Sequence, residues 1–361
     1  MTSSVLPADE TLPLLILQIT AVSGEFPAAF VSHFPGGNSY IERVIGKLKR
    51  DGLLRAYSKN ALRGLRLTTS SKRLLLQKYP ATLTDYLTGT AETNSLKCEP
   101  ERRLRLHRMA EVLLILHNAQ IPSLPWEKPT IQSSFSNPSL TPVYDSSREL
   151  KSLGRLCTKI RNSRMTGVLF TDHAFFPVYN MASTSPRWAY HAEIRLKAVL
   201  QTDFFRCSHQ TISGIVFGSS PMQMASILNN MTANHFLLDG SYPHFYFLTL
   251  DHYGEVGIAQ LCQPSIQEQL HEILSENLLP PSPAMPIEHD ALEQDGSPVL
   301  FSYLCDLPRL HRFRCALTLR NQTGSILCFD YQAEALREVF GAQVNITSID
   351  FDAYERMMLH Q

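Results

Sequence analysis

Residues 36–75 read GGNSYIERVIGKLKRDGLLRAYSKNALRGLRLTTSSKRLL, and this stretch decides the fold of the N-terminal part of the chain. It opens with two glycines, a turn that a helix cannot continue through. Ser39 and Glu42 have the spacing of a capping box, so a helix is expected to begin there. One face of this helix is apolar at helical spacing, with Ile41, Val44, Ile45 and Leu48. The other face carries Tyr40, Arg43, Lys47 and Arg50.

A small β-hairpin is expected to follow this helix. Residues 53–57 and 63–68 can pair as strands around the turn 58–61. Upstream, residues 11–22 and 27–33 predict two helices, and residues 71–79 predict a further helix after the hairpin. Helix, helix, turn, helix and basic hairpin, in this order, is the layout of a winged helix-turn-helix.

The charge of the chain supports a polyanionic partner for this region. All 361 residues together carry 33 Lys and Arg against 33 Asp and Glu, a net charge of zero. Residues 41–80 alone hold 11 basic and two acidic residues, a local net charge of +9. We therefore expect double-stranded DNA as the partner, because a winged helix places its third helix in the major groove and its hairpin along the phosphates. The helix would supply Asn38, Ser39, Tyr40, Arg43, Lys47 and Arg50, and the hairpin Arg55, Lys59, Arg63 and Arg66.

The run from residue 36 to residue 75 resembles the N-terminal segment of the replication-relaxation proteins of bacterial plasmids and conjugative elements. The resemblance covers about residues 10–80 and consists of a basic helix, the sequence GLL, a hairpin and the sequence LT before the last helix. A second run, SRMTGVLFTDHAFFPVYN at 163–180 with AEIRLKAVL at 192–200, is similar to uncharacterised proteins of integrative conjugative elements. These resemblances imply a DNA-binding protein of a mobile element, acting in replication, transfer or transcription regulation.

The whole chain is expected to be an α+β protein, a winged helix-turn-helix followed by a mixed α/β layered domain. We expect four segments: the winged helix (1–80), a connecting helical segment (81–120), a linker rich in Pro and Ser (121–147) and the α/β domain (148–361). In the connecting segment, arginines 102, 103, 105 and 108 either reach DNA, form a dimer surface or lie on a surface helix between two domains. In the α/β domain, helices are expected at 150–163, 190–205, 221–231, 266–277, 333–340 and 353–359. Strands are expected at 166–171, 175–180, 212–217, 245–250, 255–261, 299–304, 312–319, 325–331 and 344–349.

The α/β domain also permits a different hypothesis, that of a metal-dependent nuclease. Cleavage of this kind needs two or more carboxylates at one ion and a lysine near the attacking water. Asp172, in a hairpin turn, and Glu193, followed by Lys197 on the next helix, are the candidates, but the strand between them offers neither an acid nor a lysine. We therefore expect no catalytic residue, no metal and no cofactor. Two alternatives stay open: a DNA-processing enzyme with Asp172 and Glu193 as metal ligands, and a winged helix that binds protein.

Other classes of protein lack their sequence signatures here. The chain has no P-loop, no HExxH and no GxSxG motif. Its seven cysteines contain no CxxC pair, as expected for free thiols in a reducing compartment. The apolar stretch 12–22 is too short to cross a bilayer and has no basic residues before it. We expect a cytoplasmic homodimer without a membrane partner. The α/β domain is expected to serve dimerisation, partner binding or effector sensing.

Overall fold

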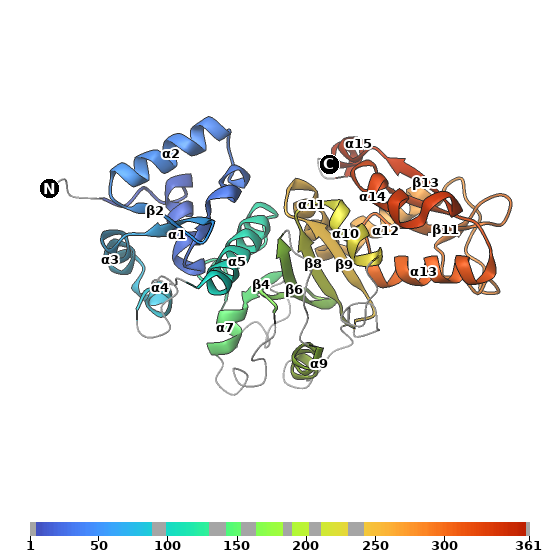
Figure 1. Cartoon of the computed structure of the whole chain (residues 1–361), viewed down its shortest axis with the longest axis horizontal. Helices are drawn as coiled ribbons and strands as arrows, with labels where there is room; N and C mark the ends of the chain where they lie inside the picture. The colour runs from blue at the N-terminus through green and yellow to red at the C-terminus, as the bar shows by residue number, and fades with distance from the viewer. Residues whose placement is uncertain are drawn as a thin grey trace. The chain divides into compact units, whose positions relative to one another are not determined.

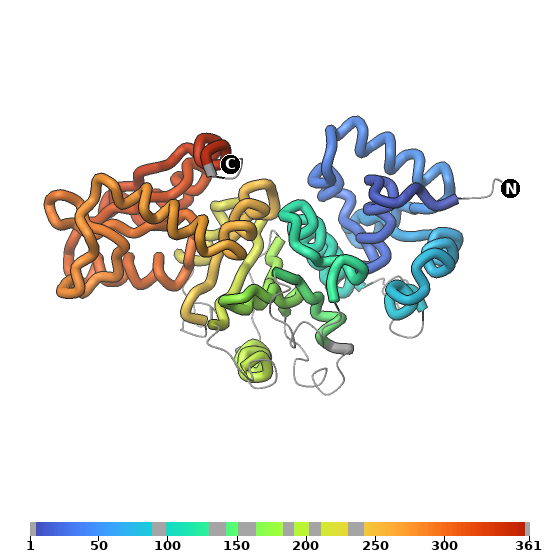
Figure 2. Tube along the Cα trace, turned by 180° about the vertical axis from the view of Figure 1, so that it is seen from behind, coloured from blue at the N-terminus to red at the C-terminus, as the bar shows by residue number. Residues whose placement is uncertain are grey.

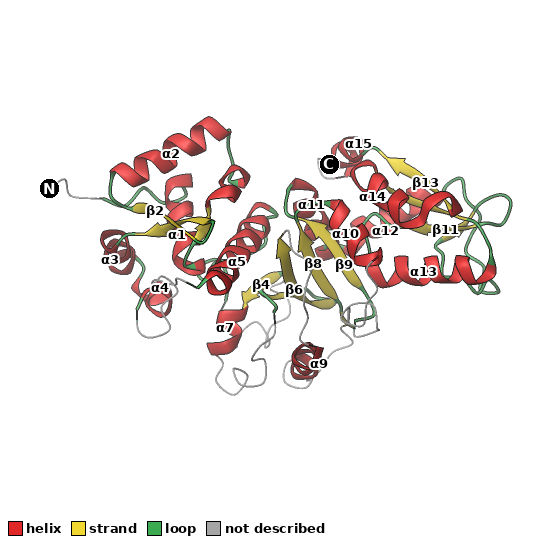
Figure 3. Cartoon of the chain, viewed as in Figure 1, coloured by secondary structure: helices red, strands yellow, loops and turns green. Residues whose placement is uncertain are grey.

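The computed structural model describes residues 5–88, 99–129, 142–152, 164–182, 190–201, 211–229 and 242–358. The chain divides into two compact units, Met1–Ser146 and Ser147–Gln361. Each unit combines helices with strands, so the protein belongs to the α+β class, as the sequence predicts (Figures 1 and 3). None of the described helices is long and apolar enough to cross a membrane.

The first unit is built on a small antiparallel sheet in which β3 is the central strand, in the order β1-β3-β2. Helices α1 and α5 contact each other and both contact this sheet (Figures 1 and 2). Residues 112–116 of α5 are fully buried, so α5 is part of the core of this unit. The strands of this sheet are β1 (Phe26–Pro27), β2 (Leu54–Lys59) and β3 (Leu62–Leu67), and β4 (Val143–Ser146) is not part of it. The helices are α1 (Leu12–Ser23), the 3-10 helix η1 (Ala28–His33), α2 (Asn38–Arg50), α3 (Thr69–Lys78), α4 (Pro80–Leu87) and α5 (Pro100–Asn118).

The predicted order of elements in residues 11–79 is confirmed, with two differences. The capping box at Ser39 and Glu42 is wrong, because the N-cap residue of α2 lies two residues before Ser39 and no side chain caps the helix. Gly37 is its N-cap residue, in an extended conformation, and its carbonyl accepts hydrogen bonds from the amides of Tyr40 (2.9 Å) and Ile41 (3.1 Å). The second difference is strand β1, which is only two residues long and was not expected.

The second unit contains a mixed sheet in which β5 and β6 form an antiparallel hairpin and β6, β8 and β9 run parallel. All five residues of β8 are buried, as is usual for a central parallel strand covered on both faces. The strands are β5 (Gly167–Phe170), β6 (Ala174–Ala182), β7 (Thr211–Ile212, beside β6), β8 (Gly214–Gly218) and β9 (Phe245–Thr249). The helices are α7 (Ser147–Ser152), α9 (Tyr190–Val199), α10 (Pro221–Asn229), α11 (His252–Cys262) and α12 (Pro264–Ser275).

A second sheet of this unit has the order β10-β11-β12-β13, with β11, β12 and β13 parallel. Its strands are β10 (Ala291–Leu292), β11 (Pro298–Phe301), β12 (Gly324–Phe329) and β13 (Val344–Ile349). Helices α13 (Leu307–Arg320) and α14 (Asp330–Phe340) connect the parallel strands, η5 (Gly341–Gln343) follows α14, and α15 (Phe351–Met358) follows β13.

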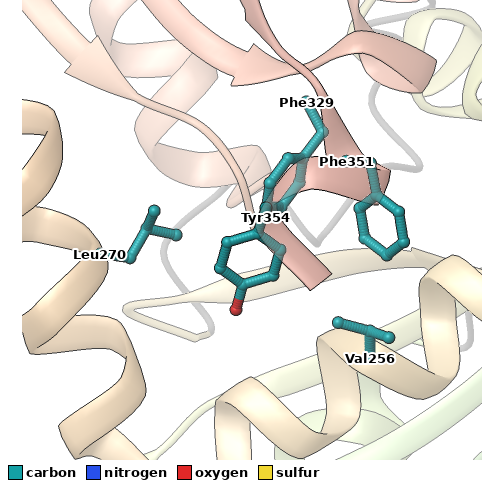
Figure 4. Packing of buried hydrophobic residues seen from close by; sticks show 5 residues of the cluster. All are labelled: Val256, Leu270, Phe329, Phe351 and Tyr354. Atoms are coloured by element: carbon teal, nitrogen blue, oxygen red, sulfur yellow. The ribbon is translucent and has the colours of Figure 1, made fainter. Parts of the chain in front are cut away.

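A cluster of buried, mainly aromatic side chains connects helices α11 and α12 with β12 and α15 (Figure 4). Val256 of α11 and Leu270 of α12 pack there with Phe329, Phe351 and Tyr354. The rings of Phe329 and Phe351 meet edge to face, with centroids 5.2 Å apart, a geometry that adds to the energy of burial. This cluster packs α15 against α11 and α12.

Two strands predicted in this unit are wrong, because residues 255–261 and 312–319 lie in helices α11 and α13. Helix α11 begins where the Asp251 side chain accepts a hydrogen bond from the Gly254 amide, a cap that the sequence reading missed. A Cβ atom on Gly254 would lie 1.8 Å from the Thr249 carbonyl oxygen, so this turn into the helix requires glycine. The strands at 167–170, 174–182, 214–218, 245–249, 298–301, 324–329 and 344–349 confirm the remaining predictions to within a few residues. Of the helix predicted at 150–163, residues 153–163 lie outside the described residues.

Candidate nucleic-acid interface

Helix α2 has one buried and one exposed face. Ile41 and Leu48 are 1% and 2% exposed, and the two apolar residues between them, Val44 and Ile45, are also buried. All six predicted contact residues of this helix are exposed: Asn38, Ser39, Tyr40, Arg43, Lys47 and Arg50. The guanidinium of Arg43 lies over the Tyr40 ring, 5.5 Å from its centroid, which orders both side chains on the surface. Helix α2 therefore presents polar, aromatic and cationic groups to solvent.

The β2–β3 hairpin carries the second group of exposed cations. Its two turn residues, Asn60 and Ala61, have φ angles of 53° and 59°, as in the type I′ turns that join two-residue hairpins. The side chains of Arg55, Lys59 and Arg63 are exposed near this turn and along the edge strand. In the part of the chain that the structure describes, no ion pair neutralises these three residues or Arg43 and Lys47.

Arg66 does not belong to this surface, and its assignment as a phosphate contact is corrected. It is 3% exposed, and its Nε donates a hydrogen bond of 2.8 Å to Oε2 of Glu25. The reason is what packs on the side chain: the carboxylate of Glu25, which directly precedes β1, pairs with its guanidinium, and the ring of Tyr57 lies against that group. Arg103, one of the arginines expected on the outside of its helix, is likewise fully buried.

Glu25 lies at the centre of a buried charged cluster that the sequence reading missed. Its carboxylate is 0% exposed and accepts hydrogen bonds from Arg66, from Nε of Arg103 (3.2 Å) and from Nε2 of His107 (2.9 Å). Because an ionised carboxylate can only accept, the Nε2 atom of His107 carries a hydrogen. Burial alone would raise the pKa of Glu25, but the hydrogen bonds from His107, Arg103 and Arg66 outweigh it and lower this pKa to about 2.

The same cluster fastens the hairpin to α5. The Arg103 guanidinium donates hydrogen bonds to the carbonyl oxygens of Lys59 (2.6 Å), Leu62 (3.0 Å) and Tyr57 (3.3 Å). The Tyr57 ring lies 4.1 Å from the guanidinium carbon of Arg66 and 4.7 Å from that of Arg103. Arg103 thus holds the backbone on both sides of the turn, and with it the exposed cations of the hairpin.

Gly64 makes the approach of Glu25 to the sheet possible. A Cβ atom at this position would lie 2.1 Å from Oε1 of Glu25, far inside van der Waals contact. Glu25 directly precedes β1, whose Phe26 pairs with Leu65 and whose Pro27 pairs with Gly64. Two features of the sequence indicate this buried cluster: an acidic residue, Glu25, between two apolar stretches, and a glycine, Gly64, inside a strand.

The residues of the nuclease hypothesis are not brought together. Asp172 lies in the β5–β6 turn. Its side chain is 71% exposed, and its Oδ1 lies 2.7 Å from Nδ1 of His173. Glu193 is buried and accepts hydrogen bonds from the Arg164 amide (2.8 Å) and the Tyr179 hydroxyl (2.9 Å). Tyr179 lies five residues after Ala174, where β6 begins beyond the turn of Asp172, which is about 17 Å along the strand. The two carboxylates therefore cannot share one metal ion, and no group of three His, Cys, Asp or Glu among the described residues could hold one.

The comparisons with known proteins give no relative. No protein-family model, no curated protein and no solved structure matches the chain significantly.

Proposed function

We propose that the first unit is a winged helix-turn-helix that binds duplex DNA, with α2 as the recognition helix and the β2–β3 hairpin as the wing. The order of its elements and the three-stranded sheet β1-β3-β2 support this proposal. In such a domain the first turns of the recognition helix face base edges and the wing lies along the phosphates.

The observation that carries the proposal is the set of exposed cations without an acidic partner on α2 and the hairpin. A protein surface of one charge sign attracts a partner of the opposite sign, and the phosphates of DNA supply one negative charge for about every 1.7 Å of duplex. Asn38, Ser39 and Tyr40 are exposed in the first turn of α2 and offer hydrogen-bonding groups to base edges. Arg43, Lys47 and Arg50 follow on the same helix, and Arg55, Lys59 and Arg63 lie on the hairpin.

The biological setting that we propose is a mobile genetic element. The resemblance of residues 10–80 to replication-relaxation proteins supports replication, transfer or transcription regulation as the process, with the cytoplasm as the compartment. The second unit then serves for homodimerisation or for binding a protein partner.

The direct test is fluorescence anisotropy of the full-length protein with a labelled random 20-base-pair duplex at low salt. The Arg43→Ala/Lys47→Ala variant is expected to bind at least about tenfold more weakly, because two charge-assisted contacts are removed. The Arg337→Ala/Arg356→Ala variant, which removes two exposed charges from the second unit, is the matched control and should bind like the unmodified protein. Equal affinity of all three proteins, or no binding at all, would contradict the proposal and favour a protein partner.

The geometry around Asp172 and Glu193 leads to a second expectation. Supercoiled plasmid incubated with the protein and Mg²⁺ should stay intact, because the two carboxylates lie too far apart to hold one ion. Agarose gels resolve nicked from supercoiled plasmid and measure this directly. Mg²⁺-dependent nicking that disappears in Asp172→Ala would instead support the nuclease hypothesis.

A further inference from the structure

A cavity of about 500 Å³ lies in the first unit, and its lining includes none of the cations of the candidate interface. It is bounded by the start of α1, by Tyr79 between α3 and α4, and by His117, Trp126 and Glu127 at and beyond the end of α5. Cavities of this volume suit small organic ligands, which commonly occupy about 300–1,000 Å³. Its shape and lining indicate which chemical class of ligand fits.

The walls of the cavity are largely apolar and aromatic. Leu12, Leu14 and Leu15 of α1 form one side. The rings of Tyr79 and Trp126 also line it, with centroids 6.4 Å apart and planes inclined by 23°. Nearly parallel aromatic faces favour a flat apolar group. The Lys78 ammonium already lies 5.2 Å from the centroid of the Tyr79 ring, so it is the face of Trp126 that favours a cation of the ligand.

One buried polar side chain in the cavity has no partner in the protein. Gln18 is 9% exposed and lines the cavity, and its side-chain amide forms no hydrogen bond with any described residue. The amide faces the cavity and not a protein partner, so a ligand with a complementary group can form a hydrogen bond with it. Gln18 therefore points to a ligand that both donates to the amide oxygen and fills the apolar space.

The charged side chains around the cavity indicate the sign of the charge that a ligand would carry. Its lining includes three carboxylates, those of Asp9, Glu10 and Glu127, and neither a lysine nor an arginine. Lys78 pairs with Asp9, Nδ1 of His117 lies 3.5 Å from Oε1 of Glu127, and the backbone amides of residues 123 and 124 donate hydrogen bonds to Glu127. Glu10 is exposed and forms no ion pair with the described residues, so its charge is available.

We propose that this cavity binds a small organic cation with an aromatic body, of the arylalkylamine class. The ring lies against the aromatic and leucine walls, the ammonium group is attracted by the carboxylates at the rim, and Gln18 accepts a hydrogen bond from it. This binding does not depend on whether the first unit binds DNA.

The test uses three probes that share a phenyl ring and a two-carbon chain but differ in charge: phenethylamine, 2-phenylethanol and 3-phenylpropanoate. Binding is followed by tryptophan fluorescence of the full-length Trp188→Phe protein, in which Trp126 is the remaining tryptophan. Phenethylamine is expected to give a saturable change, and 2-phenylethanol to bind at least about tenfold more weakly because it lacks the charge. The propanoate should give no saturable change.

Two variants link the signal to the cavity. Glu10→Gln, at an exposed position, and Gln18→Leu, inside the cavity, are each expected to weaken phenethylamine binding about three- to tenfold. Glu101→Gln removes an exposed carboxylate that does not line the cavity and should leave the affinity unchanged. Equal affinity for the three probes, or an affinity that neither Glu10→Gln nor Gln18→Leu changes, would overturn the proposal. Glu10→Gln alone keeps the test decisive if Gln18→Leu proves unstable.

Discussion

Replacing Glu25 by glutamine is expected to lower the free energy of unfolding of the first unit by about 3–5 kcal/mol. The substitution leaves the guanidiniums of Arg66 and Arg103 buried beside a neutral amide, and burying unpaired charges is costly. It also loosens Arg103, which holds the hairpin backbone at residues 57, 59 and 62. Urea unfolding, monitored by Trp126 fluorescence in a Trp188→Phe background, reports on the first unit and measures this loss.

Exposed carboxylates of the same unit provide the control for Glu25. Glu42→Gln and Glu101→Gln alter side chains at the surface and should change the unfolding free energy by less than about 0.5 kcal/mol. If Glu25→Gln behaved like these two variants, the buried cluster would contribute nothing to the stability of the fold. If only Glu25→Gln lowers the free energy of unfolding, the lost stability comes from the ion pairs of Glu25 with Arg66 and Arg103.

The pH dependence of the Glu25 contribution has a defined sign. The folded-state pKa of Glu25 is about 2, below the unfolded value of about 4.3. Folding therefore favours the ionised carboxylate, and its contribution is complete above about pH 4.3 and is lost as the pH falls toward 2. The difference in unfolding free energy between the unmodified protein and Glu25→Gln should narrow over this range. A constant difference from pH 6 to pH 2.5 would show that the carboxylate is not held in its ionised form.

The exposed face of α2 could be predicted from the sequence, but the burial of Arg66 could not. Helical periodicity separates the buried Ile41 and Leu48 from the exposed Arg43 and Lys47, because both faces lie within one short segment. Whether a strand side chain is buried depends on what covers that face of the sheet, and Glu25, which covers Arg66, precedes a strand too short to show any periodicity. The partners of Glu25 lie 41 and 78 residues away in the sequence, a separation that local patterns do not bridge.

The errors in the second unit have a similar physical cause. Residues 255–261 and 312–319 are short runs rich in apolar side chains, which fit either a strand or a buried helix. The cap at Asp251 and the close approach at Gly254 decide in favour of α11, and neither is visible as periodicity. Asp172 and Glu193 were candidates for one metal site because they flank strand β6 in the sequence. They lie apart in the structure because Asp172 is in the turn before this strand and Glu193 contacts Tyr179 further along it.

Removing the three exposed cations of the hairpin is expected to weaken the salt dependence of DNA binding. Each phosphate contact contributes about −0.9 to the slope of log K against log salt concentration. Arg55→Ala/Lys59→Ala/Arg63→Ala should therefore reduce the magnitude of the slope by about 2.7. Arg66 is excluded from this set, because its guanidinium is buried against Glu25.

A matched loss of charge elsewhere distinguishes hairpin contacts from a general effect of net charge. The control variant, Arg320→Ala/Arg337→Ala/Arg356→Ala, removes three exposed cations from the second unit. Anisotropy titrations at four salt concentrations give the slope for each protein. The control should keep the slope of the unmodified protein, because contact-driven release of counterions depends on the groups that touch phosphates. The same reduction in both triple variants would mean that the hairpin does not contact the DNA backbone, and would leave α2 without the wing that the proposal assigns to it.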